Sequence, residues 1–95
     1  MHAVVGKWRM DPAQHEEQDR VLNDQIVPMV KQAPGFVSGY WGRAADGVEH
    51  VSFVVFEDQA TAEGFATVVR SDPEDRARAG VEPDWLTIVE LVAVA

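Results

Sequence analysis

Four stretches of the chain are rich in β-branched and aromatic residues and are bounded by glycine, proline or aspartate. This pattern predicts β-strands at residues 2–10, 36–43, 48–56 and 85–94. Asp46 and Gly47 lie between the second and third strands, and an Asp-Gly pair readily adopts the positive φ angles of a tight turn. The two middle strands are therefore predicted to form a β-hairpin.

The segment from Pro12 to about Ala33 has apolar residues at helical spacing. Asp11 is a favourable N-cap, and proline suits the first position of a helix. The predicted apolar stripe consists of Leu22, Ile26, Met29 or Val30, and Ala33. Pro28 lies within this stripe and lacks a backbone N–H, so it is predicted to kink the helix or to end its regular part near Val27.

A second helix is predicted from Asp58 to Arg70, with Asp58 as its N-cap. Its predicted apolar stripe consists of Ala62, Phe65, Ala66 and Val69. Residues 73–79 are predicted to add one or two helical turns, and residues 80–84 to form a loop before the last strand.

The predicted order of elements is therefore βαββαβ. Because crossover connections are right-handed, both helices should lie on the same side of one antiparallel sheet. The sequence thus predicts one α+β domain over residues 1–95, with a ferredoxin-like, four-stranded antiparallel sheet and two helices on one face.

The predicted strands are apolar on both faces. In the third strand, Val51, Phe53 and Val55 should point one way, and Val54 and Phe56 the other. Covering a second face of several hundred Å² is worth roughly 10 kcal/mol gross at ~25 cal/mol per Å². Another copy of the chain, packed sheet against sheet, is the simplest cover; a different protein or lipid is the alternative. The sequence therefore predicts a homodimer.

Composition narrows the set of partners. The formal net charge is −8 and the isoelectric point is about 4.6, so nucleic acid and anionic membrane surfaces are not expected partners. There is no cysteine, which excludes disulfides and thiolate metal sites. The N-terminal residues lack the pattern of a signal peptide, and a cytoplasmic location is the expectation.

Several residues carry a resemblance to a known family. They are the runs Ala33–Val37 and Val54–Asp58, together with Phe65 and the Ser71-Asp72 pair. Over essentially the whole chain, this pattern resembles the antibiotic biosynthesis monooxygenase group of dimeric α/β barrel proteins. The resemblance implies a hollow between sheet and helices that binds a flat hydrophobic ligand. It does not specify an activity, because the superfamily contains oxygenases, isomerases and proteins without a known reaction.

The residues at three positions bear on one activity of the superfamily, the degradation of haem. The resemblance implies that a haem-degrading member has an asparagine on the first strand, a tryptophan on the second helix and a ligating histidine after the Ser-Asp pair. Those positions here are Gly6, Val68 and about Arg78, and no histidine follows His50. Haem degradation is therefore not expected.

The tryptophans are candidates for the walls of an aromatic pocket. Trp8 and Trp41 are the better candidates, since Trp8 shares its strand face with Gly6, whose missing side chain leaves room. The alternative for both, and for Trp85, is that they fill the core or the dimer interface.

His50, at the start of the third strand, is a candidate general base because the pKa of histidine lies close to neutral pH. The alternative is a half-exposed residue that only forms hydrogen bonds. His15, beside two glutamates in the first helical turn, is expected to face solvent. The histidines are not spaced as metal ligands, so no metal site is expected.

Glu90 interrupts an otherwise apolar strand and is a second candidate acid or base. Its alternative role is an ion pair with Lys7, Arg9 or Arg43. Tyr40 and Arg43, both on the second strand, could bind a carbonyl or an anionic group of a ligand. Each could equally be a structural side chain.

Two functional classes remain open. The first is a cofactor-independent monooxygenase, as the resemblance implies, in which a quinol or polycyclic aromatic substrate is deprotonated and itself supplies electrons to oxygen. The second is a non-catalytic dimer that binds a small apolar ligand or has only a structural role.

Overall fold

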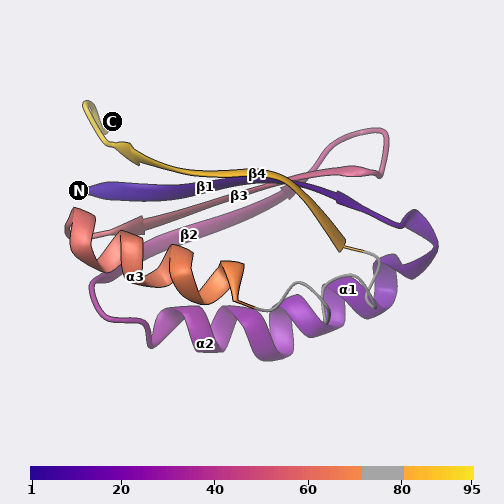
Figure 1. Ribbon diagram of the computed structural model, residues 1–95. Coiled ribbons are helices and arrows are strands. Elements are labelled where there is room, and N and C mark those ends of the chain that lie inside the picture. The colour runs from indigo at the N-terminus through magenta and orange to yellow at the C-terminus, as the bar shows by residue number, and fades with distance from the viewer. Residues whose placement is uncertain (72–80) are drawn as a thin grey trace.

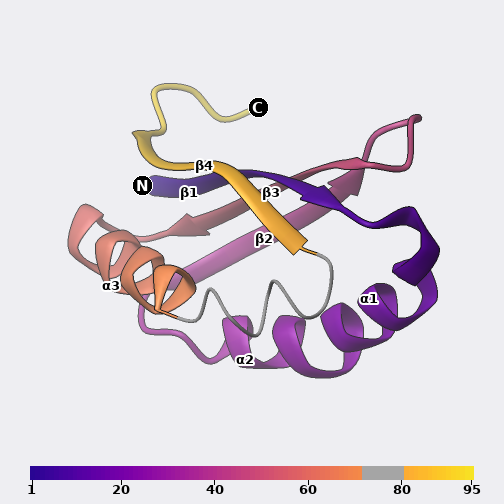
Figure 2. The ribbon, with the colours of Figure 1, turned by 45° about the vertical axis from the view of Figure 1, so that its right-hand side comes forward.

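The computed structural model describes residues 1–71 and 81–95 (Figure 1). Four strands form one antiparallel sheet in the order β2-β3-β1-β4. The strands are β1 (His2–Met10), β2 (Phe36–Arg43), β3 (Glu49–Phe56) and β4 (Val81–Glu90). All the described helices lie on one side of this sheet (Figures 1 and 2). The predicted ferredoxin-like fold is confirmed.

The first helical segment continues past its internal proline. It consists of a 3₁₀ turn η1 (Pro12–Gln14), α1 (His15–Val21), a π-helical turn η2 (Leu22–Ile26) and α2 (Val27–Lys31). Pro28 cannot donate to a carbonyl in the preceding turn, and the wider π turn accommodates this loss: the N–H of Val27 donates to the carbonyl of Leu22, five residues back. The regular α-helix therefore ends at Val21, earlier than predicted, and resumes at Val27.

The second helix, α3 (Gln59–Arg70), begins where predicted. The carboxylate of Asp58 accepts a hydrogen bond from the Thr61 N–H at 2.8 Å, as expected of an N-cap. The helix packs on the sheet through Ala62 and Ala66, which are fully buried. The further helical turns predicted at residues 73–79 lie outside the described residues.

The core lies between the sheet and the helices. Phe56 of β3 is fully buried, with the rings of Phe65 and Phe36 at centroid distances of 5.0 and 6.5 Å. The buried residues that share this cluster are Val4, Val30, Val54, Phe56, Ala62 and Ala66. The predicted apolar stripe contained either Met29 or Val30. Val30 is the residue in the core, whereas Met29 is exposed.

The last strand lies four residues earlier than predicted. β4 begins at Val81, so the loop predicted at residues 80–84 is wrong for residues 81–84. Pro83 is tolerated because β4 is an edge strand, where one row of N–H groups has no ladder partner. β4 ends at Glu90 because Glu90 pairs with His2, the first residue of β1, and no strand remains beyond it. Residues 91–95 therefore form a tail instead of the predicted strand end.

The sheet face away from the helices is apolar, as predicted. We call it the open face. Tyr40, Val51 and Trp85 point to this side and are 66, 48 and 47% exposed. The C-terminal tail extends above this face at one end of the sheet (Figure 2). Among the described residues, no helix has the length and apolar character needed to cross a membrane.

Candidate functional site

The register of the sheet brings four of the predicted site residues together. Arg43 of β2 lies opposite His50 of β3, and His50 lies opposite Trp8 of β1. Trp41 lies on the next row of the sheet, opposite Ser52. Alternation along each strand places all of these side chains on the helix-facing side. We call Trp8, Trp41, Arg43 and His50 the sheet cluster.

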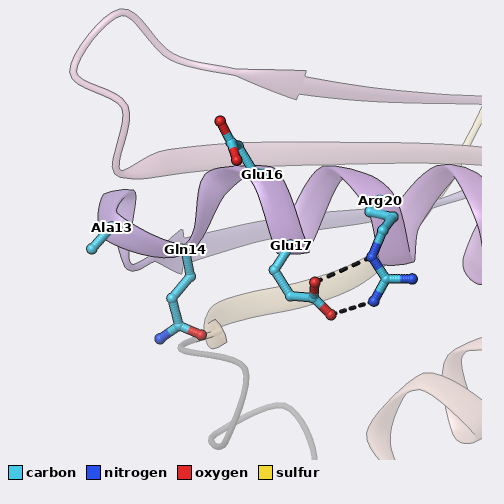
Figure 3. Close-up of a pocket in the computed structure, with 5 residues that line it drawn as sticks. All are labelled: Ala13, Gln14, Glu16, Glu17 and Arg20. Carbon is cyan, nitrogen blue, oxygen red and sulfur yellow. Dashed lines mark hydrogen bonds and ion pairs between the residues drawn. The ribbon is translucent and has the colours of Figure 1, made fainter.

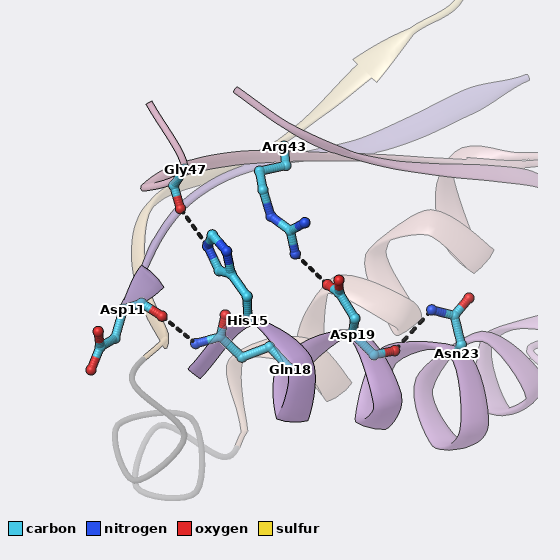
Figure 4. Close-up of polar contacts among 7 residues, drawn as sticks. All are labelled: Asp11, His15, Gln18, Asp19, Asn23, Arg43 and Gly47. Atoms are coloured by element: carbon cyan, nitrogen blue, oxygen red, sulfur yellow. Dashed lines mark hydrogen bonds and ion pairs between the residues drawn. The ribbon is translucent and has the colours of Figure 1, made fainter. Parts of the chain in front are cut away.

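Helix α1 lies beside Arg43 of the sheet cluster and beside the turn of the β2–β3 hairpin (Figure 4). The Nε2 atom of His15 lies 2.7 Å from the carbonyl oxygen of Gly47 in the hairpin turn. Arg43 forms an ion pair with Asp19 on the next turn of α1. The expectation that His15 faces solvent is wrong, because the hairpin turn provides a backbone acceptor directly above the start of the helix.

His50 has the environment of a potential base. Its Nε2 atom is buried, and no described residue forms a hydrogen bond with it. The ring of His15 packs against it edge to face, with a centroid distance of 6.0 Å. Burial lowers the pKa of His50 from its ordinary value, and the charges of Arg43 and His15 lower it further, while Asp19 and a hydrogen bond with the backbone of Gly47 oppose the shift. His50 is therefore neutral at pH 7, as a proton acceptor must be.

This shift predicts a pH dependence of stability. As the pH falls through 6.5, the ordinary pKa of histidine, the unfolded chain binds a proton at His50 that the folded chain does not yet bind. The free energy of unfolding should therefore fall between pH 7 and 5, and denaturant titrations of the His50→Gln variant should show a flatter profile. Equal slopes for the variant and the wild type would contradict the assignment. The pKa values of Asp11, Glu17, Asp46 and Asp58 are lowered by hydrogen bonds, and these groups affect stability mainly below about pH 5.

Two predicted site residues lie apart from the sheet cluster. Tyr40 is adjacent to Trp41 in the strand and therefore points to the open face, opposite Phe53. Glu90 is exposed and pairs with His2, six residues along β1 from Trp8, or roughly 20 Å at 3.3 Å per residue. The cations proposed as partners of Glu90 pair with other acids, namely Lys7 with Glu49, Arg9 with Asp84 and Arg43 with Asp19.

Two surface hollows lie elsewhere. A shallow one of about 440 Å³ lies on the outer side of α1, where Arg20 and Glu17 form an ion pair at 2.5 Å and Glu16 points away from them (Figure 3). An apolar groove of about 650 Å³ lies between α2 and α3, lined by residues such as Met29, Phe65 and Val68. Neither hollow includes a residue of the sheet cluster. In the part of the chain that the structure describes, no group of three or more histidines and carboxylates could hold a metal ion.

Three residues around the sheet cluster were not predicted as site residues from the sequence: His15, Asp19 and Ser52. The predicted topology indicates the positions of His15 and Asp19. β1 leads directly into the first helix and also pairs with β3, so the hairpin turn before β3 lies close to the start of that helix. Ser52 carries a signal in its spacing, since it lies two residues from His50 and shares its face.

Comparison with solved structures identifies the type of fold. The chain has the ferredoxin-like fold of antibiotic biosynthesis monooxygenases, as the resemblance of its sequence predicted. A candidate antibiotic biosynthesis monooxygenase from Deinococcus radiodurans superposes with a TM-score of 0.79 at 10% identity, over 100% of this chain and 96% of that one. No family model and no curated protein matches the sequence.

Two other structures with this fold have different activities. The haem degrader MhuD of Mycobacterium tuberculosis has a TM-score of 0.77 at 14% identity, over 100% of this chain and 99% of that one. SnoaB, a cofactor-independent oxygenase from Streptomyces nogalater, has a TM-score of 0.68 at 18% identity, over 98% of this chain and 94% of that one. The fold therefore does not choose between these activities.

The structure describes two of the three positions that bear on haem degradation. Gly6 is on the helix-facing side of the sheet beside Trp8, and Val68 is 57% exposed and lines the groove between α2 and α3. Arg78 lies outside the described residues. The expectation that this chain does not degrade haem stays a prediction.

Proposed function

We propose that this protein is a cofactor-independent monooxygenase that acts on a small aromatic substrate of the quinol or polycyclic type. The observation that carries the proposal is the buried Nε2 atom of His50, which has no hydrogen-bond partner among the described residues and lies on one row with Arg43 and Trp8. A base, a cation and an aromatic wall are the groups that deprotonation of a phenol-like substrate requires. The fold agrees with that of known oxygenases.

In this proposal, His50 removes a proton from the substrate and Arg43 stabilises the resulting anion. Trp8 and Trp41 contact the faces of the aromatic rings. The electron-rich anion then reduces dioxygen, so that a CH₂ group becomes a carbonyl, with one oxygen atom in the product and the other in water. The protein supplies only binding, proton transfer and electrostatic stabilisation.

Access to His50 requires movement, because its Nε2 atom is buried. The contacts that join α1 to the hairpin and to the end of β2 include the hydrogen bond between His15 and Gly47 and the ion pair between Arg43 and Asp19. Opening these contacts exposes the sheet cluster to a ligand. Such a step agrees with the general role of small closing motions in enzymes.

Oxygen uptake tests this function directly. The protein, treated with a chelator, is incubated with anthrone- and quinol-type compounds while dissolved oxygen is recorded, and ¹⁸O₂ is used to show that one oxygen atom enters the product. Uptake above the uncatalysed rate is the expected result. Quenching of tryptophan fluorescence by these compounds without oxygen uptake would instead support the non-catalytic, ligand-binding alternative.

We also propose that the protein is a homodimer joined through the open face. Tyr40, Val51 and Trp85 form part of an apolar surface, and all the described helices cover the other side of the sheet. Large exposed apolar patches are uncommon on soluble monomers. A second copy presents the same apolar surface and can cover it under two-fold symmetry.

The Val51→Asp variant should weaken this dimer by about tenfold to a hundredfold, because each interface would bury two carboxylates. Sedimentation velocity at micromolar concentration measures the effect. Val68→Asp is the matched control, since Val68 is similarly exposed but lies on α3. A wild-type protein that sediments as a monomer, or a dimer that Val51→Asp leaves intact, would overturn the proposed interface.

A further inference from the structure

The indole of Trp8 leans along its own strand and away from its direct neighbour across the sheet. The Cα atom of Trp8 lies opposite His50, but its Nε1 atom donates to the Oγ atom of Ser52, one row further along, at 3.0 Å. Gly6 makes this orientation possible. A Cβ atom at residue 6 would lie 2.6 Å from Nε1 of Trp8 and 2.8 Å from Oγ of Ser52, closer than atoms can pack.

Two residues of β3 that neighbour Trp8 carry a buried acceptor: its hydrogen-bond partner Ser52 and its direct cross-strand partner His50. One is the hydroxyl of Ser52, which is only 7% exposed and accepts the bond. The other is the Nε2 atom of His50, which is buried and has no partner among the described residues. In a site shielded from water, an unpaired donor or acceptor is costly, so the indole N–H will bond to whichever acceptor it can reach.

We propose that Ser52 is a positioning residue that keeps His50 free to accept a proton. Ser52 holds the indole N–H of Trp8 over Gly6. This N–H is thereby prevented from forming a hydrogen bond with Nε2 of His50, the nitrogen that would act as the base. The consequence for catalysis rests on the proposed function, but the arrangement of the three side chains does not.

Removal of the Ser52 hydroxyl should change the hydrogen-bond partner of the Trp8 N–H. In the Ser52→Ala variant, the Trp8 N–H loses its acceptor and turns to Nε2 of His50, one row away. A hydrogen bond to the unprotonated nitrogen stabilises neutral histidine and disfavours its protonation. The proton affinity of His50 should therefore fall, by about fivefold if the new bond is worth a typical net hydrogen bond of about 1 kcal/mol.

The experiment follows the titration of His50 by NMR in the wild type, Ser52→Ala, Trp8→Phe and the double variant. Ring signals of His50 are assigned from their absence in His50→Gln. Arg43, His15 and Asp19 also act on His50 and are unchanged in all four proteins. Ser52→Ala should lower the midpoint in the wild-type background and have no effect in the Trp8→Phe background, where no indole N–H exists.

Two further variants complete the design. Ser52→Thr retains the hydroxyl and should restore the wild-type midpoint, and Ser38→Ala removes a serine from β2 and should not change it. An unchanged midpoint in Ser52→Ala, or the same shift with and without Trp8, would overturn the proposal. Because no step requires turnover, this result is independent of whether the protein consumes oxygen.

Discussion

Replacing His50 by alanine should lower kcat for oxygen uptake by about 10²- to 10⁴-fold, the range in which a general base contributes to catalysis. His50 is the candidate base that lies with Arg43 and the two tryptophans of the sheet cluster, whereas Glu90 of β4 lies opposite His2 at the far end of β1. Stopped-flow or electrode measurements of oxygen, at saturating substrate, give kcat directly. The activity of the wild type should decline only below pH 6.5, because the pKa of His50 is lowered by burial.

The matched control is His15→Ala, which makes the same substitution in the histidine that packs against His50. His15 is hydrogen-bonded to Gly47 and is expected to affect access to the site more than proton transfer, so its loss should change kcat much less. If His50→Ala retained activity within about threefold of the wild type, far less than a base contributes, His50 would not be the base. Equal losses in both variants would indicate a shared structural effect.

Replacing Phe56 by alanine should lower the free energy of unfolding by about 3–5 kcal/mol. The side chain is fully buried, and its ring packs between those of Phe36 and Phe65. Its removal loses both the transfer free energy and the packing contacts around the cavity that remains. Because domains have stabilities of about 5–15 kcal/mol, this loss is a third or more of a mid-range value of about 10 kcal/mol, and the variant should unfold at a clearly lower urea concentration. Urea titrations followed by circular dichroism measure the loss.

Phe53→Ala provides the comparison within the same strand. Phe53 points to the open face and is only half-buried in a single chain, so its loss should cost clearly less than that of Phe56. Its cost should also depend on protein concentration if the open face is the dimer interface. A similar, concentration-independent loss for both variants would contradict the division into a core face and an interface.

Part of the candidate site could be predicted from strand periodicity alone. Side chains two residues apart share a face, so Trp41 and Arg43 belong together and Tyr40, between them, does not. Applying this rule strictly would have removed Tyr40 from the predicted ligand-binding residues. Glu90 could not be excluded in the same way, because its distance from His50 depends on the pairing register between β4 and β1, which the sequence does not give. The bounds of β4 were themselves predicted four residues out of place.

Other features depend on contacts between segments far apart in the chain. Ser52 and Trp8 are 44 residues apart, and their hydrogen bond exists only because β1 and β3 pair in one particular register. The contact of His15 with the turn at Gly47 likewise arises from the docking of α1 beneath the hairpin. No local pattern in the sequence contains this information.

Local patterns of apolar and polar residues were therefore sufficient for the order of the strands and helices, the side of the sheet that the helices cover and the apolar character of both faces. They suffice because propensity, capping and alternation act within a few residues. Tertiary structure was needed to place His50 between Trp8 and Arg43 and to direct the Trp8 N–H to Ser52. Such neighbours are set by long-range strand pairing, in which a shift of one residue would move every side chain to the opposite face.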